Sequence, residues 1–202
     1  PRSVELAMAW NVPVQVLSTF DPEIGSDLPG TLVTREEDIV EKEIVNGVAY
    51  NRNEAKVTVR SVPDVPGVAA NVFGPLADAG VNVDMIIQNI SPDGKTTDMT
   101  FTIPRSDLLR AEDVLGKIDI LKGIEIRTAN NVAKISVIGI GMSSHSGVAQ
   151  KMFRTLADKG INFQVITTSE IKISVIIKIK KIDTHFKSYN IKTVFLALFF
   201  KG

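Results

Sequence analysis

Residues 62–89 read VPDVPGVAANVFGPLADAGVNVDMIIQN, with Pro-Gly directly before an apolar helical pattern and a Gly-Val-Asn-Val turn directly after it. Residues 142–169 read MSSHSGVAQKMFRTLADKGINFQVITTS and nearly repeat the arrangement at an offset of 80 residues. Between 66–82 and 146–162, nine of seventeen positions are identical. A repeat of this length exceeds most solenoid units, so it indicates two copies of one small domain.

The composition is typical of a globular chain of one or two domains, with 202 residues of which 44% are hydrophobic. The 23 basic and 23 acidic residues cancel, so we expect no nucleic-acid partner. The absence of cysteine and of a basic-then-apolar leader favours a soluble cytoplasmic protein. The apolar run IKTVFLALFFKG is too short to cross a bilayer as a helix, so no membrane partner is expected.

Each copy reads as strand, turn, helix, strand and strand. Residues 55–62 alternate apolar and polar side chains, and a turn at 64–67 then leads into a helical stripe of Val68, Val72, Leu76 and Ala77. Gly80 is suited to ending that helix because glycine accepts the left-handed conformation. Residues 81–91 and 95–104 then resemble two strands joined by the hairpin turn SPDG.

A second helix is expected at about 106–117, with Ser106 as its cap, followed by a strand near 124–128. The resulting order, β-α-β-β-α-β, is that of a ferredoxin-like fold, in which a four-stranded antiparallel sheet carries both helices on one face. The second copy repeats the order as far as Lys178, but no fourth strand is visible after it. The β-like segment 43–52 upstream is not needed by the first copy, so it is predicted to complete the second sheet. The predicted fold class is therefore α+β.

Several stretches across residues 44–178 resemble tandem ACT domains of the regulatory region of aspartate kinase. They are GVAYNRNEAKVTVRSVPDVPGVAANVF, VNVDMIIQNIS, GKTTDMTFTIPRSD, KISVIGIGMSSHSGVAQKMF and TTSEIKISV. The pairing of DMIIQN in the first copy with TSEIKIS in the second is a narrower signature than a lone ACT repeat. Upstream, RSVELAMAWNVPVQVLSTF followed by PGTLVT resembles the last helix and strand of the family's kinase domain.

The resemblance implies three parts of the chain. Residues 1–43 are the end of a kinase-like domain and a linker, 44–129 the first ACT domain, and 130–202 the second with a divergent tail. The strand at 44–50 belongs either to the first or to the second. The resemblance also implies allosteric control of the ATP-dependent phosphorylation of L-aspartate, on the way to lysine, threonine and methionine.

The family's catalytic residues, with their ATP and Mg, are expected upstream, so we assign this chain no catalytic residue, cofactor or metal site. Whether it is part of an enzyme or a separate regulatory subunit stays open. The expected partners are amino-acid effectors and either a second ACT-bearing chain or a kinase subunit. A stand-alone ACT-type amino-acid-binding or scaffolding protein is the alternative, but such a protein has no use for the kinase-like segment.

A free amino acid presents a carboxylate, which the unsatisfied amides of a helix start favour, and an ammonium. Gly67, Val68 and Ala69 lie at such a start, with Asp64 placed to hold the ammonium. The resemblance assigns reading of the effector's side chain to Asn82, Asp84 and Gln88. In the second copy it assigns effector binding to Val148, Ala149, Asn162, Phe163 and Ser169.

The effectors in that family are lysine and threonine, bound where ACT units meet. Without the resemblance, Gly67 and Gly147 read more readily as turn residues than as ligand-binding residues, and Asp64 and Asp84 more readily as solvated carboxylates. Phe163 stands where a smaller aliphatic residue is usual, which predicts a narrower second pocket. The sequence after Lys178 departs from the family pattern, as a frameshift or a divergent tail would explain.

Overall fold

The computed structural model describes residues 2–17, 19–20, 30–33, 45, 47–139, 142 and 147–179. The divergent tail that follows Lys178 lies outside them, apart from Ile179. The chain divides into two compact units, Pro1–Ile44 and Val45–Gly202. None of the described helices is long and apolar enough to span a bilayer.

The first unit contains a helix followed by a short strand, as its sequence indicates. Helix α1 (Arg2–Ala9) is amphipathic but has no buried residue. Strands β1 (Val14–Val16) and β2 (Thr31–Val33) form an antiparallel pair, with Gln15 opposite Leu32.

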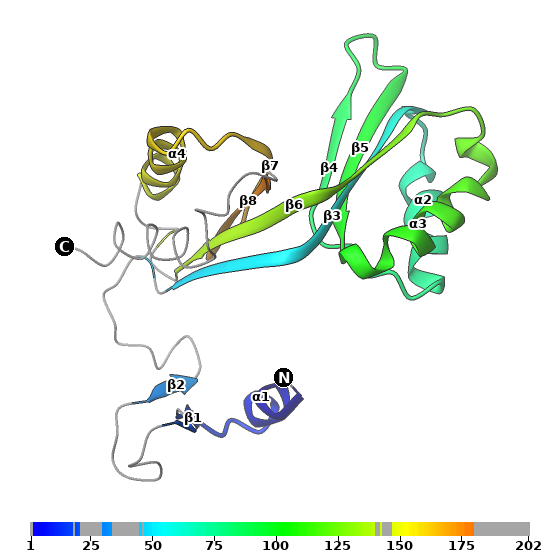
Figure 1. Ribbon diagram of the computed structural model, residues 1–202. Helices are drawn as coiled ribbons and strands as arrows, with labels where there is room; N and C mark the ends of the chain where they lie inside the picture. The colour runs from blue at the N-terminus through cyan, green and yellow to red at the C-terminus, as the bar shows by residue number, and fades with distance from the viewer. Residues whose placement is uncertain are drawn as a thin grey trace. The chain divides into compact units, whose positions relative to one another are not determined.

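The second unit is built on one six-stranded sheet in which every pair of neighbouring strands is antiparallel. The strand order is β4-β5-β3-β6-β8-β7. In chain order the strands are β3 (Gly47–Pro63), β4 (Ile86–Ile90), β5 (Thr96–Ile103), β6 (Ile126–Ile138), β7 (Phe163–Thr168) and β8 (Lys172–Lys178). Figure 1 shows the two longest strands, β3 and β6, running side by side between the two repeats.

Strands β3 and β6 each serve both repeats. Residues 55–63 of β3 pair with β5 in the first repeat, whereas residues 47–51 pair with residues 134–138 of β6. The part of the sheet that belongs to the second repeat is thus β7, β8, the end of β6 and the beginning of β3. This confirms the prediction that an upstream strand completes the second sheet.

Helices α2 (Val68–Asp78) and α3 (Leu108–Gly116) pack together against one face of the first repeat's strands (Figure 1). Leu76 and Leu115 from the helices are fully buried with Phe101 of β5. Phe73 meets Phe101 edge to face, with ring centroids 5.2 Å apart. These contacts form the predicted two-layer ferredoxin-like arrangement of the first repeat.

In the second repeat, α4 (Val148–Asp158) buries an equivalent apolar stripe. Its buried side chains are Val148, Met152, Thr155 and Leu156. The two helices therefore bury side chains at matching positions of the repeat, with Val148, Met152 and Leu156 standing where α2 has Val68, Val72 and Leu76.

Both repeat helices are preceded by a glycine in the left-handed conformation. Gly67 has φ 90° and Gly147 has φ 104°, values that an L-residue with a side chain rarely adopts. The two glycines therefore meet the same backbone requirement, that of a sharp entry into a helix.

Three local predictions were wrong. Ser106 is not a helix cap, because Pro104 leads into a short 3₁₀ turn, η2 (Arg105–Asp107), and α3 follows at Leu108. Ala77 is exposed, because Val68, Val72 and Leu76 already occupy the buried stripe at a spacing of four residues. Residues 81–85 are not part of β4, although Asp84 and Met85 exchange backbone hydrogen bonds with Thr102.

Candidate functional site

The start of α2 combines a sharp turn with exposed first-turn backbone. The amide of Val68 donates to the Val65 carbonyl at 3.2 Å, and that of Asn71 donates to Gly67 at 3.0 Å. Val68 turns its side chain into the core, whereas Gly67 and Ala69 are exposed. A helix start leaves its first amides without intrahelical acceptors, so this one offers N–H groups to an anion.

Asp64 and Gln88 meet beside that start. Gln88 lies on the edge strand β4 and donates from Nε2 to Asp64 Oδ1 at 3.4 Å. The Asp64 backbone is held in turn by a 2.9 Å hydrogen bond from its amide to the Lys95 carbonyl. A helix start, a carboxylate and a side-chain amide therefore lie together at one edge of the sheet.

Asp84 lies in a different cluster. Its carboxylate forms an ion pair with Lys134 of β6, whose ammonium also pairs with Glu54 Oε1 of β3 at 2.7 Å. Asn82, two residues earlier, is exposed. The structure thus brings the side chains of Asp64 and Gln88 together beside Gly67, and places the carboxylate of Asp84 toward the paired strands β3 and β6.

The residues predicted in the second repeat are spread around α4 and β7. Val148 is buried and Ala149 half-buried at the start of α4, and Asn162 is exposed just before β7. Phe163 stacks on Phe153 of α4, with ring centroids 5.3 Å apart, so its ring packs against the helix. Ser169 lies in the turn between β7 and β8, where its amide donates to the Lys172 carbonyl at 2.7 Å.

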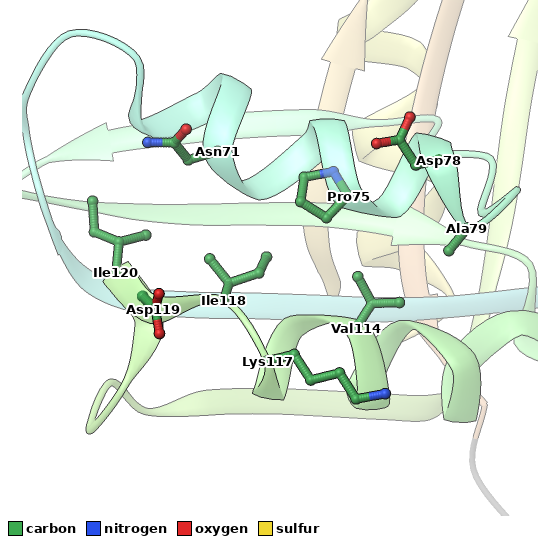
Figure 2. Close-up of a pocket in the computed structure, with 9 residues that line it drawn as sticks. All are labelled: Asn71, Pro75, Asp78, Ala79, Val114, Lys117, Ile118, Asp119 and Ile120. Atoms are coloured by element: carbon green, nitrogen blue, oxygen red, sulfur yellow. The ribbon is translucent and has the colours of Figure 1, made fainter.

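A separate groove of about 730 Å³ lies between α2 and the segment that follows α3. Figure 2 shows Pro75 of α2 facing Val114 and Ile118 across it. None of the sequence-predicted site residues lines this groove. Two charged residues that sequence reasoning missed, Glu54 of β3 and Lys134 of β6, lie instead on the two long paired strands. The available signal was their spacing, since they occupy the same position of the two copies with opposite charges.

In the described part of the chain, no group of three or more His, Asp or Glu side chains is arranged to hold a metal ion. What the first repeat offers is a helix start for an anion, a carboxylate for a cation and an amide for a polar side chain. This set of groups suits a zwitterionic ligand such as a free amino acid.

Comparison with known proteins places these features in a family. The ACT domain family matches residues 57–120 and, in a second form, residues 135–186. The aspartokinase of Pseudomonas aeruginosa is 48% identical over 187 residues, which are 90% of this chain and 43% of that protein. The chain therefore spans less than half the length of this curated relative.

This chain aligns with almost the whole length of two proteins of known structure. One, of aspartokinase alpha and beta subunits, has 44% identity and a TM-score of 0.64, with 77% of this chain and 98% of that chain aligned. The other, the ligand-free regulatory subunit of aspartate kinase from Thermus thermophilus, has 34% identity and a TM-score of 0.65 over 77% of this chain and 99% of that chain.

Proposed function

This chain belongs to the aspartate kinase family, of which it is the regulatory region with two ACT domains, and we propose that it senses end-product amino acids for an attached or associated kinase. The effectors proposed are threonine and lysine. The activity they control is the ATP-dependent phosphorylation of L-aspartate, which the kinase part of the family carries out.

The observation that carries the proposal is the meeting of Asp64 and Gln88 at the start of α2. Their hydrogen bond is long, at 3.4 Å, and joins an exposed amide to a half-buried carboxylate. Little free energy is lost when a ligand replaces such a bond. The α-carboxylate of an amino acid then takes the α2 amides, its ammonium takes Asp64, and its side chain lies beside Gln88.

Regulation requires that the bound amino acid favour one of two arrangements. A ligand with equal affinity for both arrangements shifts nothing, so the effector acts through differential binding. The edge position of Gln88 supports this, because a residue on β4 meets both the ligand and whatever pairs with that edge. The paired ACT domains therefore have two arrangements, and the effector shifts the equilibrium between them.

The first unit supports association with a kinase. Its described residues expose large apolar side chains, including Trp10 at 75% and Leu6 at 61%. An amphipathic helix with no buried face is stabilised when that face packs against another protein surface. A kinase domain, whose last helix and strand this unit resembles, provides such a surface.

The test is calorimetric titration of threonine and lysine into the chain and into Asp64→Ala and Gln88→Ala variants. Loss of a charge-assisted hydrogen bond is worth about 1.5–3 kcal/mol, so affinity is expected to fall roughly ten- to a hundredfold. Asp78→Ala, an exposed carboxylate at the far end of α2, is the matched control and retains the parent's affinity. Parent affinity in both site variants for every effector that binds would exclude this site.

A further inference from the structure

Strand β3 contains a β-bulge shortly before the turn that leads into α2. The register of β3 against β5 shifts between Val59 and Val62. Two residues of β3, Arg60 and Ser61, there oppose the single residue Asp98 of β5. An extra residue of this kind bends its strand and changes the direction of the side chains that follow.

The bulge decides the face of the sheet on which Asp64 lies. Val59 is fully buried, and an uninterrupted alternation would next bury Ser61. Ser61 is instead exposed and Val62 is fully buried, after which Pro63 is exposed and Asp64 half-buried. Because of the one extra residue, Asp64 comes to the same side of the sheet as Val62, which is the side that carries α2.

Gln88 reaches Asp64 from that same side. It lies opposite Met99 of β5, and Met99 belongs to the core beneath α2 and α3. Residues directly opposite each other share a face of the sheet, so Gln88 also lies on the helix side. A shift of one residue in β3 would turn Asp64 to the other face and separate it from Gln88. The proposed amino-acid site therefore depends on the bulge.

The carboxylate of Asp98 holds the bulge. Its Oδ1 accepts a hydrogen bond from the Ser61 amide at 2.7 Å, and its Oδ2 lies 3.7 Å from Arg60 Nε. Ser61 has φ 52°, in the left-handed region that residues with a side chain rarely adopt. Such a conformation persists only where the surrounding contacts favour it. The hydrogen bond to Asp98 is the contact that favours it here.

The second repeat lacks this device in its described strands. Strand β6 leads toward α4 as β3 leads toward α2, but its residues 132–138 pair with residues 172–178 of β8 without a register shift. The residue of β8 opposite the end of β6 is Lys172, which has no carboxylate to accept an amide. The bulge and its carboxylate therefore occur together in the repeat that has the Asp64–Gln88 pair.

We propose that Asp98 is a positioning residue of the amino-acid site, because its hold on the Ser61 bulge sets the face on which Asp64 meets Gln88. The inference rests on the proposed function and deepens it. Asp98 acts through the backbone rather than on the ligand. It lies opposite Asn89 of β4, on the face of the sheet away from the one that Gln88 shares with the helices.

The test separates the hydrogen bond from the charge. Asp98→Ala removes the acceptor, whereas Asp98→Asn keeps a side-chain carbonyl oxygen for the Ser61 amide. Threonine and lysine are titrated calorimetrically into the parent and both variants. Affinity for each effector that the parent binds is expected to fall about tenfold in Asp98→Ala and to stay within about twofold in Asp98→Asn. Glu125→Ala is the matched control, since it removes the other carboxylate partner of Arg60 and leaves the Ser61 hydrogen bond in place.

Nuclear magnetic resonance gives a readout that needs no ligand. The side-chain amide of Gln88 reports its hydrogen bond to Asp64. Its resonance is expected to move in Asp98→Ala to the position that it has in Asp64→Ala. It is expected to stay in place in Asp98→Asn and Glu125→Ala, which a general loss of stability would not achieve.

A glycine variant keeps the test decisive if Asp98→Ala does not fold. Glycine adopts a positive φ without a steric penalty, so Ser61→Gly lets the bulge form without its anchor. The double variant Ser61→Gly/Asp98→Ala is therefore expected to fold and to bind within about twofold of the parent. A folded double variant that binds about tenfold more weakly would show that Asp98 acts by another route, and would overturn the inference.

The remaining outcomes separate the inference from the proposed function. Parent affinity in Asp98→Ala would overturn the inference and leave the proposed function standing. An equal loss in Asp98→Asn would do the same, because the charge rather than the hydrogen bond would then be responsible. If the parent binds neither threonine nor lysine, the proposed function is rejected and the inference with it.

Discussion

Lys56 lies in the middle of β3, opposite Thr102 of β5 and Ala129 of β6. It is half-buried, and burial lowers the pKa of its ammonium below 10.5. The unfolded chain therefore holds this proton more tightly than the native protein does. Below the folded-state pKa, the free energy of unfolding is reduced by the whole amount that corresponds to this pKa difference. The reduction disappears as the pH rises from the folded-state pKa to 10.5.

Replacing Lys56 by Met is expected to raise the melting temperature at neutral pH. Methionine keeps the apolar stem and removes the charge that burial penalises. The difference from the parent should narrow as the pH approaches 10.5, which thermal unfolding at a series of pH values would measure. Lys122→Met, at a lysine side chain that is 72% exposed, is the control. A gain that is the same at every pH would show that the charge is not the cause.

Individual site residues differ in how far the sequence could reveal them. The turn before α2 made Asp64 a candidate for holding an ammonium, whereas Gln88 was assigned to the same ligand only through the resemblance to the family. The engagement of Asp84 by Lys134 was not predicted, since the two are separated by 50 positions and no local period connects them. Their meeting depends on the pairing of the strands in the assembled sheet, where β6 lies next to β3.

Strand β4 forms an open edge of the six-stranded sheet. Ile86 and Ile90 are 50% and 61% exposed, and they project from the same face of the strand as Gln88. An exposed strand edge with apolar side chains is a site for pairing with another chain. We therefore expect this edge to take part in self-association, as is common for closed symmetric dimers.

The corresponding experiment is light scattering on the parent and on an Ile86→Lys/Ile90→Lys variant at tens of micromolar. The parent is expected to have at least twice the monomer mass, and the variant to dissociate because lysines at an edge oppose strand pairing. Leu109→Lys, at a residue of α3 that is 80% exposed, controls for the added charge. A monomeric parent, with and without threonine and lysine, would be incompatible with association through β4.

The elements with strong periodicity were predictable, and the junctions between them were not. The apolar stripe of α2 and the alternation of residues 55–62 each specify one element. The polar run 51–54 separates two apolar segments and reads as a break, yet β3 continues through it with register shifts on both sides of Glu54. The Glu54 carboxylate is paired there with Lys134 and accepts a hydrogen bond from Asn51, contacts that the periodicity of the sequence does not reveal.

The chain as a whole joins its first unit to the six-stranded sheet by a covalent connection. Residues 27–47 lead from the first unit into β3, and most of them lie outside the described residues. Because β3 belongs to both ACT domains, a change in their arrangement acts on the strand to which this segment is attached. We expect the segment to carry the effector's signal to the kinase.

The measurement is aspartyl phosphate formation by this region joined to an intact kinase domain, with and without threonine plus lysine. A flexible Gly/Ser insert after Thr34, a position outside the described residues, is expected to weaken inhibition while leaving basal activity intact. An insert of equal length in the exposed hairpin turn at 92–94 is the control. Inhibition that survives the Thr34 insert unchanged would exclude coupling through this segment.

The sharing of β3 and β6 also limits how the gene for this chain can be shortened. Recombination between the two copies at the codons of Gly67 and Gly147 would delete 80 residues and join β3 directly to α4. The shortened product lacks β6, which supplies the partner of residues 47–51 in the described sheet. Those residues can then find an equivalent partner only in the β3 of a second shortened molecule. Such a deletion would make folding a bimolecular reaction, with a yield that depends on how much protein the cell makes.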